Sequence, residues 1–121
     1  MKYVSVQHQG IDHFIPFREV VGKFSFLFIT KEGKSIELAK RLMQEGHKVK
    51  VHFTDRTKAF PIDGGVGNWE SWKGWADVIV YDITDFKEKL ASLKKSGYYC
   101  VDYSVLKNET AEQIYKLAEE S

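Results

Sequence analysis

The residues best suited to bind a ligand form a short polar stretch, 30–34, which lies between an apolar run and a helical pattern. Backbone N–H groups at the start of a helix lack partners within the helix, so they attract phosphate or carboxylate groups. Lys31 and Lys34 would add positive charge, and Gly33 would let a ligand approach the backbone closely. The pattern predicts a site for a small phosphorylated or carboxylate ligand. Its substrate-binding residues would be Thr30, Lys31, Glu32, Gly33, Lys34 and Asp82.

Known nucleotide motifs and catalytic pairs do not account for this stretch. Gly33-Lys34-Ser35 looks like the end of a Walker A loop, but Phe28 stands where that motif requires its first glycine. The dinucleotide fingerprint GxGxxG is also missing after the apolar run. Ser35 has no nearby base, and Cys100 lies in an apolar run where a thiol is expected to be buried and inert. The sequence therefore predicts a binding scaffold without catalytic residues.

The elements that must position these residues alternate between strand and helix patterns. Four runs predict strands, at 24–29, 48–53, 77–82 and 98–104. Three stretches predict helices, near 33–46, 84–96 and 109–120. Alternation of this kind predicts an α/β fold, a Rossmann-like open parallel sheet of order 2-1-3-4 with helices on both faces. Ligands bind such sheets beyond the carboxyl ends of the strands where the chain reverses direction, and residues 30–34 and Asp82 would lie there.

Residues 1–22 do not follow this rhythm. They predict an N-terminal extension, a strand or hairpin added to the sheet, before a Rossmann-like domain over residues 23–121. His8 and His13 fall in the extension without a carboxylate or cysteine at ligand spacing, so we interpret them as surface histidines rather than a metal site.

The segment between the second and third predicted strands is irregular. Asp55 flanks the expected site, and a loop containing Gly64, Gly65 and Gly67 could fold over it, so these four residues are candidate loop contacts. Three tryptophans at 69, 72 and 75 would lie along one side of a helical turn, eclipsed if the turn is 3₁₀. We expect them to cover the open face of the sheet; the alternative is stacking on a base or ring, which requires an exposed indole.

Composition restricts the partners. The chain has 121 residues, enough for one domain with its own core. Its formal net charge of +1 gives no electrostatic reason to expect nucleic acid or an anionic membrane as a partner. A single cysteine, with neither a signal peptide nor a long apolar segment, predicts a cytoplasmic protein.

The stretches KEGKSIELAKRLMQEGHKVKVHF, WESWKGWADVIVYD and YYCVDYSVLKNETAEQIYKLAEES resemble the N-terminal domain of phosphoribosylamine–glycine ligase (GAR synthetase). The resemblance covers roughly residues 24–121 and rests on pattern more than on invariant motifs. It implies a pre-ATP-grasp domain that helps bind substrate in a ligase of purine biosynthesis, which performs ATP-dependent carboxylate–amine ligation. ATP and magnesium would belong chiefly to a separate ATP-grasp region outside these residues, so we expect no cofactor in this chain.

Two alternatives stay open. The helix followed by Gly46-His47-x-Val49 is also similar to the N-terminal half of GT-B glycosyltransferases. A standalone Rossmann-like binding or interaction module would need no partner domain, and it could form a homo-oligomer through exposed tryptophans. Fold resemblance alone does not decide the activity.

Overall fold

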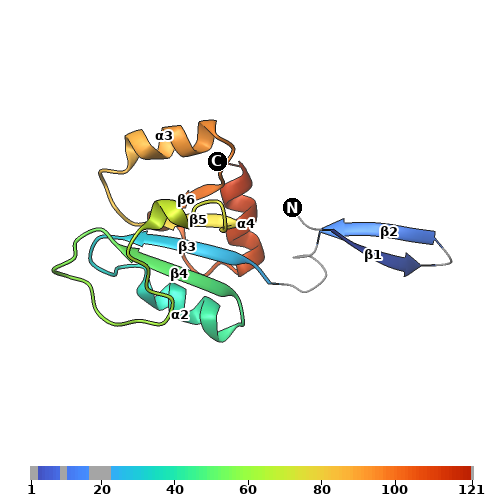
Figure 1. Ribbon diagram of the computed structural model, residues 1–121, viewed down its shortest axis with the longest axis horizontal. Helices are drawn as coiled ribbons and strands as arrows, with labels where there is room; N and C mark the ends of the chain where they lie inside the picture. Colours follow the sequence, from blue (N-terminus) through green and yellow to red (C-terminus); the bar gives the residue numbers. More distant parts are fainter. Residues whose placement is uncertain (1–2, 9–10, 17–22, 121) are drawn as a thin grey trace.

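The computed structural model describes residues 3–8, 11–16 and 23–120 of the chain (Figure 1). Its strands are β1 (Tyr3–His8), β2 (Ile11–Pro16), β3 (Ser25–Thr30), β4 (Lys48–Phe53), β5 (Val78–Tyr81) and β6 (Cys100–Asp102). Its α-helices are α2 (Ile36–Gln44), α3 (Lys87–Lys95) and α4 (Ala111–Glu120), and its 3₁₀ helices are η1 (Trp69–Ser71) and η2 (Tyr103–Val105). All four strands and three helices predicted for residues 24–120 are therefore present, with shorter helices than the sequence pattern indicated.

The central sheet has four parallel strands in the order β4-β3-β5-β6 (Figure 1). This is the predicted order 2-1-3-4, with the most apolar strand, β3, in an inner position. Thr30 pairs with Phe53 at the carboxyl ends of β3 and β4, and Ser25 pairs with Lys48 at the amino ends. The chain reverses direction between β3 and β5, so the predicted fold class is confirmed.

Strand β3 is buried on both faces because its side chains alternate between two hydrophobic clusters. Phe26 and Phe28 face α2 and α4, where they pack with Leu42 and Ile114. On the opposite face lie Leu27, Ile29, Ile79, Tyr81, Trp69, Phe86 and Leu93, contributed by the sheet, η1 and α3. The continuous apolar sequence of β3 follows from this double burial.

The N-terminal hairpin predicted from the sequence is present. Strands β1 and β2 pair in antiparallel register, from Tyr3 with Pro16 to His8 with Ile11. They form a two-stranded sheet of their own, so the prediction of a strand or hairpin added to the main sheet is wrong on this point. The predicted boundary near residue 22 and the side chains of His8 and His13 lie outside the described part of the chain.

The last helix begins with a reciprocal cap. The Thr110 N–H donates to Gln113 Oε1 at 2.9 Å, and the Gln113 N–H donates to Thr110 Oγ1 at 3.2 Å. This capping box satisfies two backbone donors that the start of α4 would otherwise leave unpaired. Among the helices assigned to the described residues, none has the length and apolarity needed to cross a lipid bilayer.

Candidate functional site

Asp82 organises the polar loop that follows β3. The residue comes directly after β5, and its Oδ2 accepts hydrogen bonds from Thr30 Oγ1 at 2.7 Å and from the Ser35 N–H at 2.9 Å. Its Oδ1 accepts a longer bond from the Lys31 N–H at 3.3 Å. The structure therefore brings the two predicted parts of the site together across the carboxyl ends of neighbouring strands. We call residues 30–35 together with Asp82 the anchored loop.

The carboxylate of Asp82 takes the place that an external anion was expected to occupy. It receives the N–H groups of Lys31 and Ser35, and a third N–H, that of Gly33, donates to Thr30 Oγ1 at 2.8 Å. Within the described residues, the backbone N–H groups of Glu32 and Lys34 have no hydrogen-bond partner. Any anion at the anchored loop would thus be bound by these two groups and by the exposed Lys31 and Lys34 side chains.

Side chains packed around Gly33 limit the space beside the anchored loop. Gly33 has φ +95°, a conformation that side chains rarely adopt, and a Cβ atom there would lie 3.1 Å from Phe60 Cε1 and 3.2 Å from Ile36 Cγ1. Phe60 is 42% exposed and packs its ring against Phe53 with 5.1 Å between centroids. Gly33 is thus required by the packing of the loop itself, and Phe60 covers the side on which a ligand was expected to approach.

Asp55 lies close to the loop, as predicted. The Thr54 N–H donates to the Thr30 carbonyl at 2.8 Å, which joins the end of β4 to the end of β3. Hydrogen bonds from the Thr57 hydroxyl and N–H lower the pKa of Asp55, and the charges of Lys58 and Lys31 lower it further. Asp55 therefore remains ionised and adds negative charge next to Lys31.

The glycine-rich loop lies along the outer edge of β4. The Val51 N–H donates to the Gly64 carbonyl at 2.9 Å, and the Val66 N–H donates to the Val51 carbonyl at 2.8 Å, so the segment forms a parallel bridge with the strand.

Gly64 has φ +81°, and a Cβ atom there would be 2.3 Å from the Val49 carbonyl oxygen. Gly65 pairs at Val51, and a Cβ atom at Gly67 would be 3.9 Å from Arg56 Nη1. The structure places this loop beside the middle of β4, where it extends the sheet.

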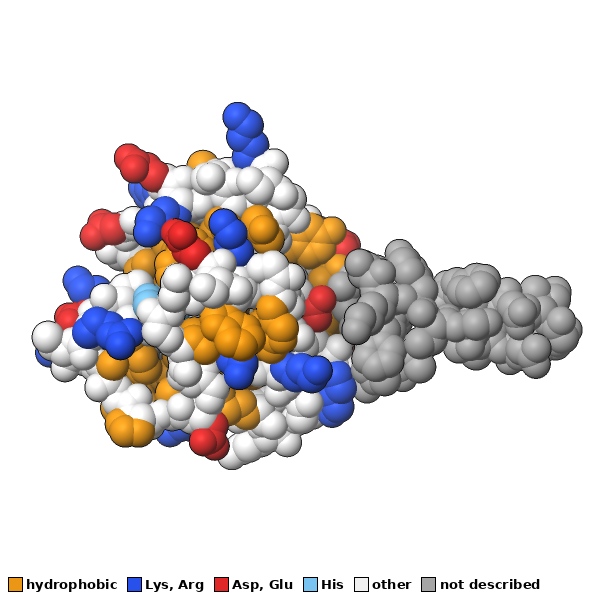
Figure 2. All heavy atoms as spheres, viewed as in Figure 1, with side chains coloured by type: hydrophobic (Ala, Val, Ile, Leu, Met, Phe, Trp, Pro, Cys, Tyr) orange, Lys and Arg blue, Asp and Glu red, His pale blue; other side chains and the backbone are white. Residues whose placement is uncertain are grey.

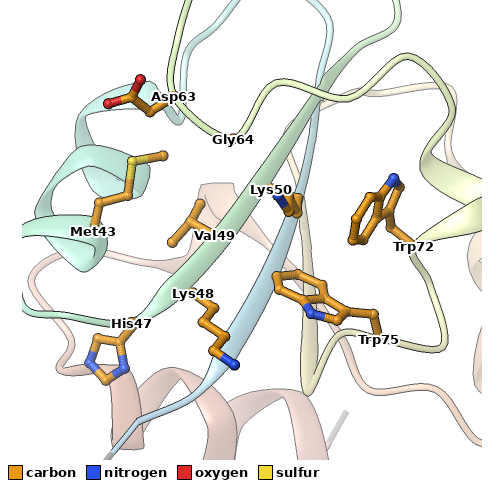
Figure 3. A pocket seen from close by; sticks show the side chains of 9 residues that line it. All are labelled: Met43, His47, Lys48, Val49, Lys50, Asp63, Gly64, Trp72 and Trp75. Carbon is orange, nitrogen blue, oxygen red and sulfur yellow. The ribbon is translucent and has the colours of Figure 1, made fainter.

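A groove opens beside the amino-terminal half of β4 and was not predicted from the sequence. It has a volume of ≈ 560 Å³ and is lined by Met43, His47, Lys48, Val49, Lys50, Asp63, Gly64, Trp72 and Trp75 (Figure 3). We call it the β4 groove. Hydrophobic side chains are also exposed together near the middle of the face shown in Figure 2, with Lys and Arg side chains beside them.

The three tryptophans have two different roles. The backbone N–H of Trp72 donates to the Trp69 carbonyl, and the backbone N–H of Trp75 donates to the Trp72 carbonyl, both at 3.0 Å, so successive turns follow the three-residue pattern of a 3₁₀ helix. Trp69 is 8% exposed and covers the face of the sheet, as expected. Trp72 and Trp75 are only partly buried, and their rings meet edge to face with 5.6 Å between centroids. They also satisfy the requirement for stacking, an accessible indole.

His47 lies at one end of the β4 groove and is held as a neutral acceptor. Its Nδ1 accepts the Phe24 N–H at 3.0 Å, so Nδ1 carries no proton. Burial lowers the pKa of His47 and the charge of Lys23 lowers it further, while Glu45 raises it. A proton on Nδ1 would replace this hydrogen bond by a contact between two donors.

We therefore expect folding stability to fall as pH decreases through the pKa of His47. Because the folded-state pKa lies below the ordinary value of 6.5, the unfolded chain binds the proton more readily. The contribution is complete above pH 6.5 and is lost below it, with a slope of at most about 1.4 kcal/mol per pH unit for one proton. Urea unfolding measured from about pH 8 to about pH 5 checks this.

The matched variant is His47→Asn, which keeps an acceptor near Phe24 but does not titrate in this range. Its unfolding midpoint should decline less with falling pH than that of the parent. Parallel curves for the two proteins would contradict the role given to His47.

Neither Cys100 nor Ser35 is placed as an activated nucleophile, and the described residues contain no group of three or more possible metal ligands. Cys100 is 1% exposed, and burial raises the pKa of its thiol to about 11, so almost none of it is thiolate near neutral pH. Ser35 Oγ is buried without a hydrogen-bond partner, so no base is placed to activate it. No group of three or more His, Cys, Asp or Glu in this part of the chain could hold a metal ion.

Fold and site together define a small α/β domain with a four-stranded parallel sheet and a polar loop at the point where the chain reverses. No protein-family model matches the chain, and no curated protein or solved structure is similar enough to count as a match.

Proposed function

We propose that the chain is a substrate-binding and scaffold domain of a phosphoribosylamine–glycine ligase-like ATP-grasp enzyme. The observation that carries the proposal is the anchored loop. It lies at the reversal point of a parallel sheet, it is held by Asp82, and it leaves two N–H groups and two lysines for a ligand. A phosphorylated sugar is the ligand class that the resemblance implies and that N–H and ammonium groups would recognise.

The anchored loop would contribute charge, backbone N–H groups and a positioning carboxylate to ligand binding. Lys31 and Lys34 attract the anion, and the N–H groups of Glu32 and Lys34 bind its oxygens. Asp82 is a positioning residue that fixes the loop through Thr30 and Ser35. Its negative charge opposes an incoming anion, so we expect weak binding by this domain alone, with Kd on the order of 1 mM.

ATP and magnesium would supply the chemistry of ligation in such an enzyme. The described residues form no group of three or more His, Cys, Asp or Glu, and this proposal assigns them no catalytic step. The domain's contribution would be to hold the sugar phosphate in position for an ATP-grasp region.

The test is a titration with ribose 5-phosphate followed by backbone amide NMR. We expect the amide resonances of residues 30–35 and of Asp82 to shift, and the shifts to decrease as salt is added. Lys34→Gln should weaken binding about two- to fivefold, as expected for one exposed charge contact. The control is Lys40→Gln, which removes another exposed positive charge, from α2. Unshifted loop resonances, or equal weakening by the two variants, would contradict the proposal.

A further inference from the structure

We propose that the β4 groove binds a planar ring carrying a negatively charged group, the combination that a nucleoside monophosphate presents. The inference does not depend on the function proposed for the anchored loop. It rests on two partly exposed indoles and two lysines that converge on one side of the edge strand β4 (Figure 3).

The indoles supply the ring-binding part of the site. Trp72 and Trp75 meet at 88° between ring planes, so they present flat surfaces in two directions rather than one stacked block. Every nucleobase has a face that stacks on such a surface. The volume of ≈ 560 Å³ belongs to the whole groove, of which the indoles form one side, and Met43 and Asp63 lie across β4 from them (Figure 3).

The lysines supply the charge. Lys50 Nζ lies over the Trp72 ring, 4.8 Å from its centre, so the ammonium is held against one face of this indole and leaves the other face and Trp75 for stacking. Lys48 is two residues away on the same face of the strand and is exposed. The one acidic residue among those lining the groove, Asp63, lies on the far side of β4 from the indoles (Figure 3). Positive charge therefore dominates next to the rings, which favours an anionic ligand.

The β4 groove and the anchored loop are separate along the sheet. The groove is lined by Lys48 and Lys50 in the first half of β4, while the anchored loop begins at Thr30, which pairs with Phe53 at the other end. The five residue steps from Lys48 to Phe53 correspond to about 16 Å of strand. A ligand of mononucleotide size in the groove would leave the anchored loop free, so binding at each location can be distinguished by the residues that respond.

The experiment is a titration with adenosine 5′-monophosphate (AMP) in which the three indole N–H resonances are followed. Each resonance is assigned from the single variants Trp69→Phe, Trp72→Phe and Trp75→Phe. We expect the resonances of Trp72 and Trp75 to shift, and that of Trp69 to move much less because its ring is buried in the core beneath α3. An equal response of all three, or no response at millimolar AMP, would overturn the proposal.

Single variants distinguish the contribution of stacking to AMP binding from the contribution of charge. Trp72→Leu should weaken AMP binding about 5- to 150-fold, the range that loss of one base–aromatic stack predicts. Lys50→Gln should weaken it less and should also reduce its dependence on salt. The control is Lys89→Gln, which removes a lysine from the face of the buried Trp69, where Nζ lies 5.6 Å from the ring centre. If Lys50→Gln and Lys89→Gln weakened AMP binding equally, only the net charge of the protein would matter. That result would overturn the proposed site.

Two partial ligands test the two halves of the proposed chemistry. Adenosine has the ring without the charge, and ribose 5-phosphate has the charge without the ring. Both should shift the Trp72 and Trp75 resonances less than AMP at equal concentration. Adenosine binding as tightly as AMP would exclude a role for the lysines, and ribose 5-phosphate doing so would exclude stacking. Either result would overturn the proposal without affecting the assignment of the anchored loop.

Discussion

Replacing Asp82 by alanine is expected to lower the free energy of unfolding by about 3–5 kcal/mol, because hydrogen bonds to a charged group contribute about 1.5–3 kcal/mol each. The substitution removes the acceptor for Thr30 Oγ1, for the Ser35 N–H and for the more distant Lys31 N–H. Thr30 is fully buried, so its hydroxyl could not exchange the lost partner for water. Urea unfolding followed by far-ultraviolet circular dichroism measures the loss.

Two further variants test whether the lost hydrogen bonds cause the destabilisation expected for Asp82→Ala. Asp82→Asn can keep an oxygen in front of Thr30 and Ser35 and place its amide group towards Lys31, so it should cost only about 1 kcal/mol. Asp85→Ala removes an exposed carboxylate three residues further along and should change stability by less than about 0.5 kcal/mol. If Asp82→Ala were no less stable than Asp85→Ala, the loop would not depend on its anchor.

Replacing Trp69 by alanine is expected to cost about 3–5 kcal/mol of folding stability, the range for removing a large aromatic side chain from a core. Trp69 is 8% exposed and packs against Phe86 with 5.8 Å between ring centroids, and Phe86 in turn stacks on Tyr81 at 5.1 Å. No α-helix lies between β4 and β5, so this indole covers sheet surface that a crossover helix would otherwise bury. Thermal and urea unfolding of the variant measure the cost.

The matched control is Trp72→Ala, three residues further along the same turn. Trp72 is partly exposed at the edge of the β4 groove, so its removal should destabilise the fold by much less than the removal of Trp69. Equal losses from the two substitutions would show that the tryptophans act as one packed unit. The distinction between the buried Trp69 and the partly exposed Trp72 would then be wrong.

Much of the fold could be predicted because burial leaves a periodic signature. The unbroken apolar run of β3 follows from burial on both faces, and the alternation of Val49, Val51 and Phe53 with Lys48, Lys50 and His52 follows from burial on one. Alternating strands and helices then restrict the topology to a parallel sheet, whose strand order was predicted correctly. The separate two-stranded sheet was not foreseen, because alternation in a hairpin does not indicate which strands lie next to it.

The candidate site could be predicted only in part. The ends of β3 and β5 had to be neighbours once the strand order was known, which brought Thr30 and Asp82 together. The sequence did not show that the Asp82 carboxylate would itself accept the N–H groups of the loop. This depends on the direction in which the side chain points, and the residue type says little about that direction. The position of Gly64 against β4 likewise depends on one backbone bridge. The β4 groove was missed because its lysines and tryptophans lie far apart in the sequence.

The backbone bridge between the glycine loop and β4 has a consequence for the solubility of the folded protein. An open edge strand offers unpaired N–H and C=O groups to which a strand of another molecule can add, the first step of aggregation. At one edge of the sheet, β6 has only three residues, which limits such pairing. At the other edge, the outward-facing groups of Val51 are already occupied by Gly64 and Val66, and Lys48 and Lys50 place like charges beside them. The loop thereby acts as a short, non-extendable partner strand that discourages edge-to-edge polymerisation of the domain.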